Sequence, residues 1–154
     1  MRHRISLFTL ISFLILACSK DDDPCSDTTL IPKSLESEYG CTDTKYQMEI
    51  DLAGDFTIIS DQANFNALVT GSCLPEIDFS MYDLVIGKMN FTSGNTSIEY
   101  VLETECETRD QNLVVTFYQN MTAHAPNLTY HALIPKLDGG QDLTVEIIVL
   151  PSPI

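Results

Sequence analysis

The sequence predicts a small, mostly β domain of the α+β class: an antiparallel β-sheet sandwich or open barrel with one short helix. From residue 79 onward, apolar and β-branched segments recur and are separated by turn sequences at residues 92–95 and 138–140. Only the stretch after Asp61 has apolar residues at helical spacing. Because strands joined by short turns usually pair antiparallel, we expect an antiparallel arrangement.

The individual elements follow from the local pattern. The expected strands are residues 45–52, 56–59, 82–89, 98–102, 113–118, 129–134 and 143–150. Residues 82–89 form a nearly continuous apolar run, which is typical of a buried central strand. The helix is expected to begin at Ser60-Asp61 and to place Phe65, Leu68 and Val69 on one face. Gly71 then suits the C-cap position.

The N-terminal segment has the pattern of an export signal. A basic start with Arg2 and Arg4 precedes an uncharged apolar run over residues 5–16. That run is too short for a bilayer-spanning helix, which needs about 20 apolar residues. It ends in Ala17-Cys18, which resembles the lipobox of bacterial lipoproteins. The resemblance implies a diacylglycerol on the sulfur of Cys18; an ordinary signal peptide with an incidental cysteine is the alternative.

Three regions are therefore expected: a signal peptide over 1–17, an acidic flexible tether over 18–40 and a single β-rich domain over 41–154. The tether begins with a short polar and acidic sequence, which is Ser19, Lys20, Asp21, Asp22 and Asp23. Ser19 after the cysteine fits sorting to the outer membrane, and the acidic run resembles a surface-export signal of some Gram-negative lipoproteins. We expect a lipid-anchored, surface-exposed protein. A solvated spacer on the periplasmic side is the alternative.

The chain is strongly acidic, with a formal net charge of −14. Such a surface repels phosphate groups, so neither nucleic acid nor anionic lipid headgroups are expected partners. The densest acidic group of the domain, Glu103, Glu105 and Glu107, has a period of two. On a strand these carboxylates share one face, which we expect to be solvated rather than to bind a cation.

Four cysteines remain after Cys18, an even number in an exported domain, which predicts two disulfides. Three connectivities are possible. We favour Cys25–Cys41, which ties the tether to the domain edge, and Cys73–Cys106, which joins the helix-loop segment to a strand. The cysteines are too scattered for a zinc site, because no Cys-x-x-Cys pair occurs.

No motif for catalysis is present, so we expect a protein that is not an enzyme and needs no cofactor or metal. The sequence has neither a Gly-x-Ser-x-Gly elbow nor a glycine-rich phosphate loop. Two histidines follow the signal segment, His124 in a polar loop and His131 in a strand. Their spacing shows no convergent ligand set, so both are expected to be surface or edge residues.

The best candidate for a binding surface is the loop over residues 120–127. Recognition residues concentrate on loops held by a rigid scaffold, and this loop contains Asn120, Thr122, His124 and Asn127. A plain connection between strands is the alternative. We also expect the turn over residues 92–96 to lie near this loop at one end of the sheet.

Residues 76–149 resemble the C-terminal domain family of a bacterial protease-complex subunit. The resemblance is carried by Asp78-Phe79 before the apolar strand, by the Ser93-Gly94 turn, and by a strand that ends at Pro135. It implies a β-rich, non-catalytic module that accompanies another extracytoplasmic protein, such as a protease. We therefore expect a module that binds or stabilises a protein partner; a glycan or small-ligand binding module is the alternative.

Overall fold

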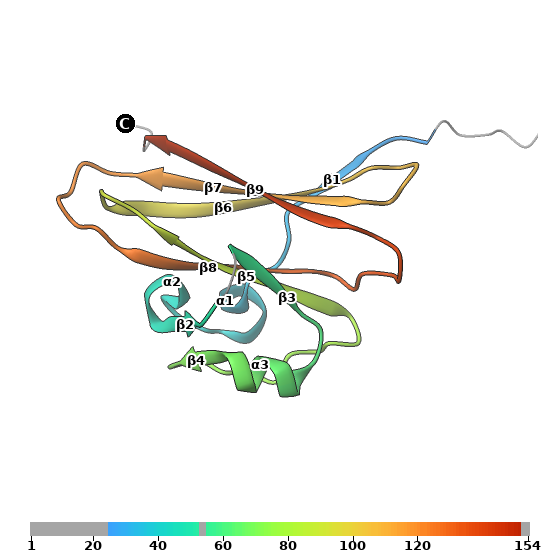
Figure 1. Ribbon diagram of the computed structural model, residues 1–154, viewed down its shortest axis with the longest axis horizontal. Helices are drawn as coiled ribbons and strands as arrows, with labels where there is room; N and C mark the ends of the chain where they lie inside the picture. Colours follow the sequence, from blue (N-terminus) through green and yellow to red (C-terminus); the bar gives the residue numbers. More distant parts are fainter. Residues whose placement is uncertain (1–24, 53–54, 152–154) are drawn as a thin grey trace, which may run out of the picture.

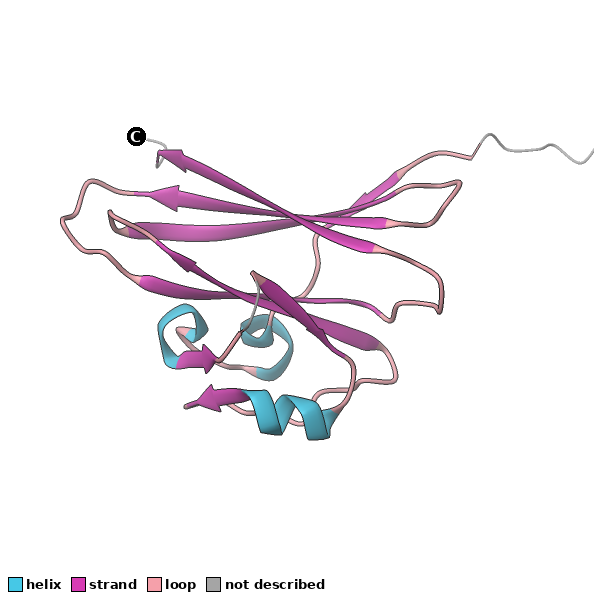
Figure 2. Cartoon of the chain, in the orientation of Figure 1, coloured by secondary structure: helices cyan, strands magenta, loops and turns pink. Residues whose placement is uncertain are grey.

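A computed structural model describes residues 25–52 and 55–151 (Figures 1 and 2). The elements in chain order are β1 (Thr28–Leu30), α1 (Leu35–Tyr39), α2 (Thr44–Gln47), β2 (Met48–Ile50), β3 (Phe56–Ile59), α3 (Gln62–Leu68), β4 (Val69–Gly71), β5 (Tyr82–Asn90), β6 (Asn95–Thr104), β7 (Gln111–Gln119), β8 (Asn127–Pro135) and β9 (Leu143–Pro151). The predicted signal peptide, Cys18 and the acidic run over 19–23 lie outside the described residues.

Two sheets stack face to face, so the predicted β-sandwich is confirmed (Figure 1). One sheet has the strand order β1-β6-β7-β9 and the other has the order β3-β5-β8. Strands β7 and β9 pair in parallel, unlike the antiparallel pairing that we expected throughout. The reason is that β8, which lies between them in sequence, belongs to the opposite sheet. The chain therefore crosses over and returns in its original direction.

Two hydrophobic cores lie on opposite faces of the three-stranded sheet. Val85, Tyr130 and Ile134 pack toward the four-stranded sheet, whereas Leu84 and Leu133 pack toward the helices on the outer side. Strands β5 and β8 are covered on both faces, which explains their nearly continuous apolar sequences. The prediction that residues 82–89 form a buried central strand is confirmed, because β5 lies between β3 and β8.

The predicted helix is present as α3, but it is not the only one. Asp61 caps it through a 2.8 Å hydrogen bond from the backbone N–H of Asn64. Gly71 is not its C-cap; it lies in β4 at φ +143, where a Cβ atom would lie 2.2 Å from the carbonyl oxygen of Gln47. The predicted strand over 45–52 is partly wrong, because α2 occupies its first residues and only β2 is extended.

The folded domain begins earlier than residue 41. Strand β1 pairs with β6 in the register Thr29 to Glu103, and α1 buries Leu35 completely. The expectation of a flexible tether up to residue 40 is therefore wrong for residues 28–40. This segment has too few apolar residues for its strand and helix to be recognised in the sequence. The pairing of β1 with β6 and the capping box of Ser34 and Ser37 stabilise its structure instead.

The disulfides are Cys25–Cys106 and Cys41–Cys73, so the predicted connectivity is wrong. Strand β1 runs antiparallel along the end of β6, which brings Cys25 beside the turn that contains Cys106. Helix α1 ends near the loop after β4, which brings Cys41 to Cys73. In both cases the partner is set by pairing between elements far apart in sequence.

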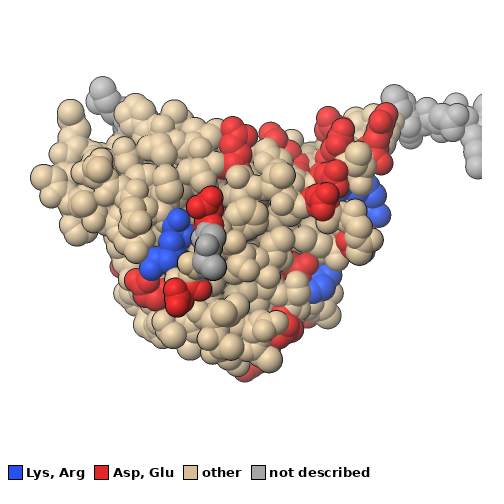
Figure 3. Space-filling model, in the orientation of Figure 1, with Lys and Arg blue, Asp and Glu red and all other residues tan. Residues whose placement is uncertain are grey.

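The sandwich has two distinct ends. At one end, which we call the anchored end because it follows the predicted anchor at Cys18 in the chain, lies the Cys25–Cys106 disulfide, and acidic residues gather there (Figure 3). Five carboxylates line a depression at this end: Asp27, Glu103, Glu105, Asp110 and Asp142. At the opposite end, which we call the distal end, lie the β5–β6 turn, the loop over 120–127 and the last residues of β9 (Figure 1).

Candidate functional site

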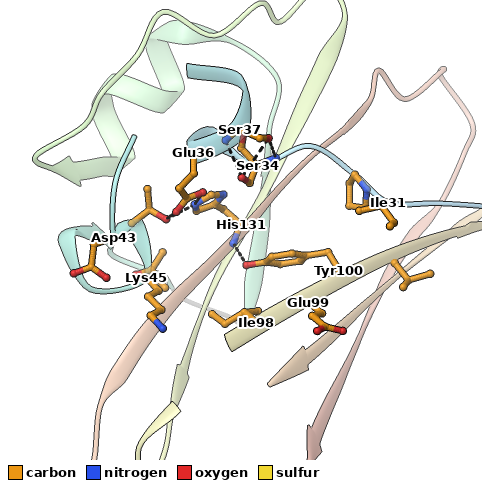
Figure 4. A pocket seen from close by; sticks show the side chains of 14 residues that line it. Ile31, Ser34, Glu36, Ser37, Asp43, Lys45, Ile98, Glu99, Tyr100 and His131 are labelled. Carbon is orange, nitrogen blue, oxygen red and sulfur yellow. Dashed lines mark hydrogen bonds and ion pairs between the residues drawn. The ribbon is translucent and has the colours of Figure 1, made fainter. Parts of the chain in front are cut away.

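A groove of about 610 Å³ opens on the side of the sandwich, between β6 of one sheet and β8 of the other (Figure 4). Helices α1 and α2 form its other walls. Its lining combines an apolar part, with Ile31, Pro32 and Ile98, and a polar part that converges on His131. A concave site with few, well-placed polar groups is the usual form of a ligand pocket.

Three side chains from three elements meet in the polar part of the groove. The Thr44 hydroxyl, on α2, donates to a carboxylate oxygen of Glu36, on α1. The same hydroxyl lies 2.6 Å from Nε2 of His131, on β8, and the second carboxylate oxygen of Glu36 lies 3.5 Å from that nitrogen. His131 and Thr44 are buried, whereas 39% of the Glu36 side chain is exposed.

Proton counting fixes the roles in this cluster. A threonine hydroxyl has one proton, and that of Thr44 goes to Glu36. Its oxygen must therefore accept from His131, so Nε2 of His131 carries a proton. Nδ1 of His131 is buried and has no hydrogen-bond partner among the described residues. The hydrogen-bonding capacity of the His131 ring is therefore satisfied at Nε2 but not at Nδ1 within the described residues.

The carboxyl group of Glu36 stays ionised in this setting. Partial burial alone raises the pKa of Glu36, but the hydrogen bonds from His131 and Thr44 outweigh it and hold the pKa well below its usual range. On the opposite wall, burial raises the pKa of Tyr100. The groove therefore presents a carboxylate and a protonated phenol at neutral pH.

The cluster does not have the geometry of a nucleophile activated by histidine. In such a triad the hydroxyl donates to the imidazole, and the carboxylate accepts from the other ring nitrogen. Here the Thr44 hydroxyl donates to Glu36 instead, and it is only 2% exposed.

The predicted surface position is wrong for one of the two histidines, His131, and agrees with the structure for the other, His124. His131 lies on β8, an edge strand of its sheet, but its side chain is buried, contrary to the surface position that we expected. Helices α1 and α2 cover it, and their presence was not evident from the sequence. His124 is exposed in the loop over 120–127.

The loop over 120–127 and the turn before β6 lie together, as predicted. The backbone N–H of Gly94 donates to the carbonyl of Thr122 at 3.1 Å, and that of Asn120 donates to the carbonyl of Gly94 at 2.9 Å. Asn120 Oδ1 also accepts from the Thr122 hydroxyl at 2.6 Å. Asn120 and Thr122 therefore support the loop itself, and Thr122, His124 and Asn127 are exposed.

Large apolar side chains are exposed beside this loop. Met121 is fully exposed, and Val149 and Leu150, at the end of β9, are 43% and 41% exposed. Strand β9 is an edge strand, and its Pro151 is aligned with Gln119, the residue before the loop. Exposed apolar groups next to an open sheet edge are typical of surfaces that bind other proteins.

The two candidate regions, the loop over 120–127 and the groove, differ in how far they could be predicted from the sequence. The loop was identified from its polar composition and its proline. Glu36, Thr44 and Tyr100 were missed, because nothing in the sequence shows that they converge. One signal was present: His131 interrupts an otherwise apolar strand, and a polar residue at such a position needs buried partners.

Comparisons with protein-family models, with curated proteins and with solved structures found no match to this chain. The resemblance of residues 76–149 to the protease-complex module therefore stays a prediction. Within residues 25–52 and 55–151, no group of three or more Cys, His, Asp or Glu side chains is arranged to hold a metal ion. No helix in this part of the chain is long and apolar enough to cross a membrane.

Proposed function

We propose that this protein is a lipid-anchored, non-catalytic module that binds a protein partner through its distal end. The observation that carries the proposal is the placement of exposed apolar residues. Met121, Val149 and Leu150 lie at the end of the sandwich opposite the Cys25–Cys106 disulfide, where the N-terminal segment enters. A chain tethered by Cys18 presents this end away from its membrane.

The anchored end supports the same orientation. Its carboxylates, which include Glu103, Glu105 and Asp142, repel an anionic lipid surface. The distal end has no comparable concentration of charge in the view of Figure 3. Acidic groups therefore keep the base of the domain off the membrane, while the apolar end stays accessible. The predicted resemblance makes an extracytoplasmic protease the first partner to test.

The anchor is tested by Cys18→Ala in the full-length protein. We expect the variant to remain unprocessed and to incorporate no radiolabelled fatty acid, whereas the parent protein incorporates it. Replacing Asp21, Asp22 and Asp23 with alanine should keep lipidation and reduce the access of external protease to intact cells. Lipid on the Cys18→Ala variant would contradict the anchor at Cys18. Unchanged protease access to the triple alanine variant would contradict the export role of the three aspartates.

Partner binding is tested by a double variant at the distal end, Met121→Lys with Leu150→Lys. Both side chains are exposed, so lysine is tolerated there without opening the core. After mild cross-linking of intact cells, a specific partner should be recovered with the parent protein and at least tenfold less with this variant. Thr29→Lys, exposed at the anchored end, is the matched control and should recover it fully. Equal recovery by all three proteins argues against distal binding.

A second candidate function, a small-ligand binding module, is supported by the groove between β6 and β8. Its volume and its convergent polar groups are those of a ligand site. The two functions use different surfaces of the domain, so they are tested independently.

A further inference from the structure

We propose that the groove between β6 and β8 binds a primary ammonium group on an alkyl chain, with Glu36 as its counter-ion. This inference rests on the second candidate function, the small-ligand module, and is independent of the distal end. It is carried by the ionised carboxylate of Glu36, by the contacts that its two oxygens already make and by the apolar residues that line the same groove.

The charge of the groove favours a cation. The carboxylate of Glu36 faces the groove, whereas Figure 4 shows those of Asp43 and Glu99 directed away from the cluster, and that of Glu99 accepts from the Tyr118 hydroxyl on the exposed face. The lining also contains one ammonium group, from Lys45. That ammonium group is already engaged, because Nζ of Lys45 donates to the carbonyl of Thr96 at 3.3 Å and lies 5.2 Å from the centre of the Tyr46 ring. The charge that faces the groove is therefore the carboxylate of Glu36, and the lysine is held away from it.

The acceptor geometry favours ammonium over guanidinium. One carboxylate oxygen of Glu36, Oε1, accepts from the Thr44 hydroxyl. The other, Oε2, lies 3.5 Å from Nε2 of His131, and the side chain is 39% exposed. A guanidinium group binds best when both carboxylate oxygens are free for its two parallel N–H groups. Because the His131 contact at Oε2 is long, this oxygen keeps a lone pair for one further N–H donor, which fits the compact charge of an ammonium group.

The opposite part of the groove suits an alkyl stem. Ile31 is 83% exposed, and Pro32 and Ile98 line the same groove. Apolar side chains in a groove that also contains a carboxylate give an amphipathic ligand both an apolar contact and a counter-ion. Figure 4 shows Ile98 and Tyr100 on β6 facing the cluster of Glu36 and His131 across the groove.

The cluster behind Glu36 is built to keep this carboxylate in place. The His131 side chain is only 3% exposed and lines the groove, while its Nδ1 has no partner among the described residues. A buried polar ring that is satisfied on one side costs stability. Its Nε2 side serves Glu36 and Thr44, which places the oriented carboxylate at the mouth of the groove.

The test is a methyl NMR titration of the full-length lipidated protein in non-ionic detergent, labelled at isoleucine and threonine. Butylammonium chloride is the probe, with pentan-1-ol as its neutral analogue and butylguanidinium as its forked analogue. We expect saturable shifts of the Ile98 and Thr44 methyl groups, while Ile148 on β9 stays unchanged. Butylammonium should bind at least tenfold more tightly than either analogue. Equal binding of pentan-1-ol, or no saturable shift, would overturn the proposal, and equal binding of butylguanidinium would overturn the ammonium assignment.

Glu36→Gln tests the counter-ion, and Glu103→Gln, an exposed glutamate outside the groove, is its control. The first variant should weaken butylammonium binding at least tenfold and the second should not change it; equal binding by both contradicts the role of Glu36. If Glu36→Gln does not fold, the comparison of the three ligands on the parent protein still tests the proposal.

Two further ligands, a free diamine and an acetylated lysine amide, distinguish the two sources of an ammonium group. Tighter binding of the diamine indicates a soluble amine, and tighter binding of the lysine amide indicates the lysine side chain of a partner protein.

Discussion

The hydroxyl group of Tyr100, on β6, accepts a hydrogen bond from the backbone N–H of His131, on β8, at 3.2 Å. The two residues belong to different sheets, so this bond joins the two layers of the sandwich at the side where the groove opens. The bond also gives an acceptor to the backbone N–H group of His131, which lies on an edge strand and points away from β5. Tyr100 therefore both closes the sheet edge and forms one wall of the groove.

Tyr100→Phe should destabilise the domain by about 1–3 kcal/mol, because it leaves a buried backbone N–H without an acceptor. The measurement is equilibrium unfolding in urea under non-reducing conditions. Tyr118→Phe is the control: its hydroxyl donates to Glu99 at 3.4 Å on the exposed face, and its loss should change stability by less than about 0.5 kcal/mol. Equal effects of the two variants would mean that the Tyr100 bond contributes nothing specific.

A peptide map of the non-reduced protein should show Cys25 linked to Cys106 and Cys41 linked to Cys73. The first bond closes a longer loop than the second, with sequence separations of 81 and 32. In the chain-entropy model the two bonds stabilise by about 4.5 and about 3.7 kcal/mol. Thermal melts of the two double serine variants measure these losses. Recovery of Cys25 linked to Cys41 would contradict the placement of β1.

Gly94→Ala should disrupt the distal loop. A Cβ atom at this position would lie 2.0 Å from Oγ1 of Thr122 and 2.3 Å from Oδ1 of Asn120, so both side chains must shift and their mutual hydrogen bond is disturbed. We expect faster amide hydrogen exchange over residues 120–126 and a stability loss of about 1–3 kcal/mol. Gly139→Ala is the control, because its Cβ would meet nothing within 4 Å. Unchanged exchange in Gly94→Ala would show that turn and loop are not in contact.

Asp83 should make the domain sensitive to acid. Its side chain is 2% exposed; burial alone raises its pKa, but the Lys136 ammonium at 2.6 Å and the backbone N–H of Leu137 at 2.9 Å outweigh this and lower the pKa. A pKa depressed in the folded state gives stability that is present above the unfolded value, about 3.9, and is lost as the pH falls below it.

Asp83→Asn should therefore cost about 3 kcal/mol at pH 7, where it breaks a buried charge pair, and much less at pH 3. Urea unfolding at the two pH values measures the difference. Asp138→Asn, at an exposed carboxylate paired with Arg109, should show little effect at either pH. A pH-independent loss in Asp83→Asn would assign the role of Asp83 to packing rather than charge.

Local sequence patterns predicted those parts of the fold that depend on local signals. The apolar run around Val85 predicted a central strand, and Asp61 marked the start of α3. Pairing between distant segments was not predictable: β1 has only three residues, and its place beside β6 is what links Cys25 to Cys106. The parallel pairing of β7 with β9 depends on which sheet receives β8, which turn lengths do not reveal.

The candidate sites also differ in whether they depend on local sequence signals or on contacts between distant segments. The contact between the loop over 120–127 and the turn over 92–96 was predicted, because the ends of neighbouring strands meet at one edge of a sandwich. The groove was not, because Glu36 and Thr44 come from a segment that was expected to be tether and strand. Only the helices formed there bury His131 and bring the three side chains together.

The most direct test of the distal binding surface is site-specific photo-cross-linking in intact cells. A photoreactive amino acid replaces Leu150 at the distal end or Glu103 at the anchored end of the full-length protein. We predict one discrete, light-dependent adduct with another protein from position 150 and none from position 103. An adduct from position 103 without one from position 150, or no adduct from position 150, would contradict the proposal that the distal end binds a protein partner.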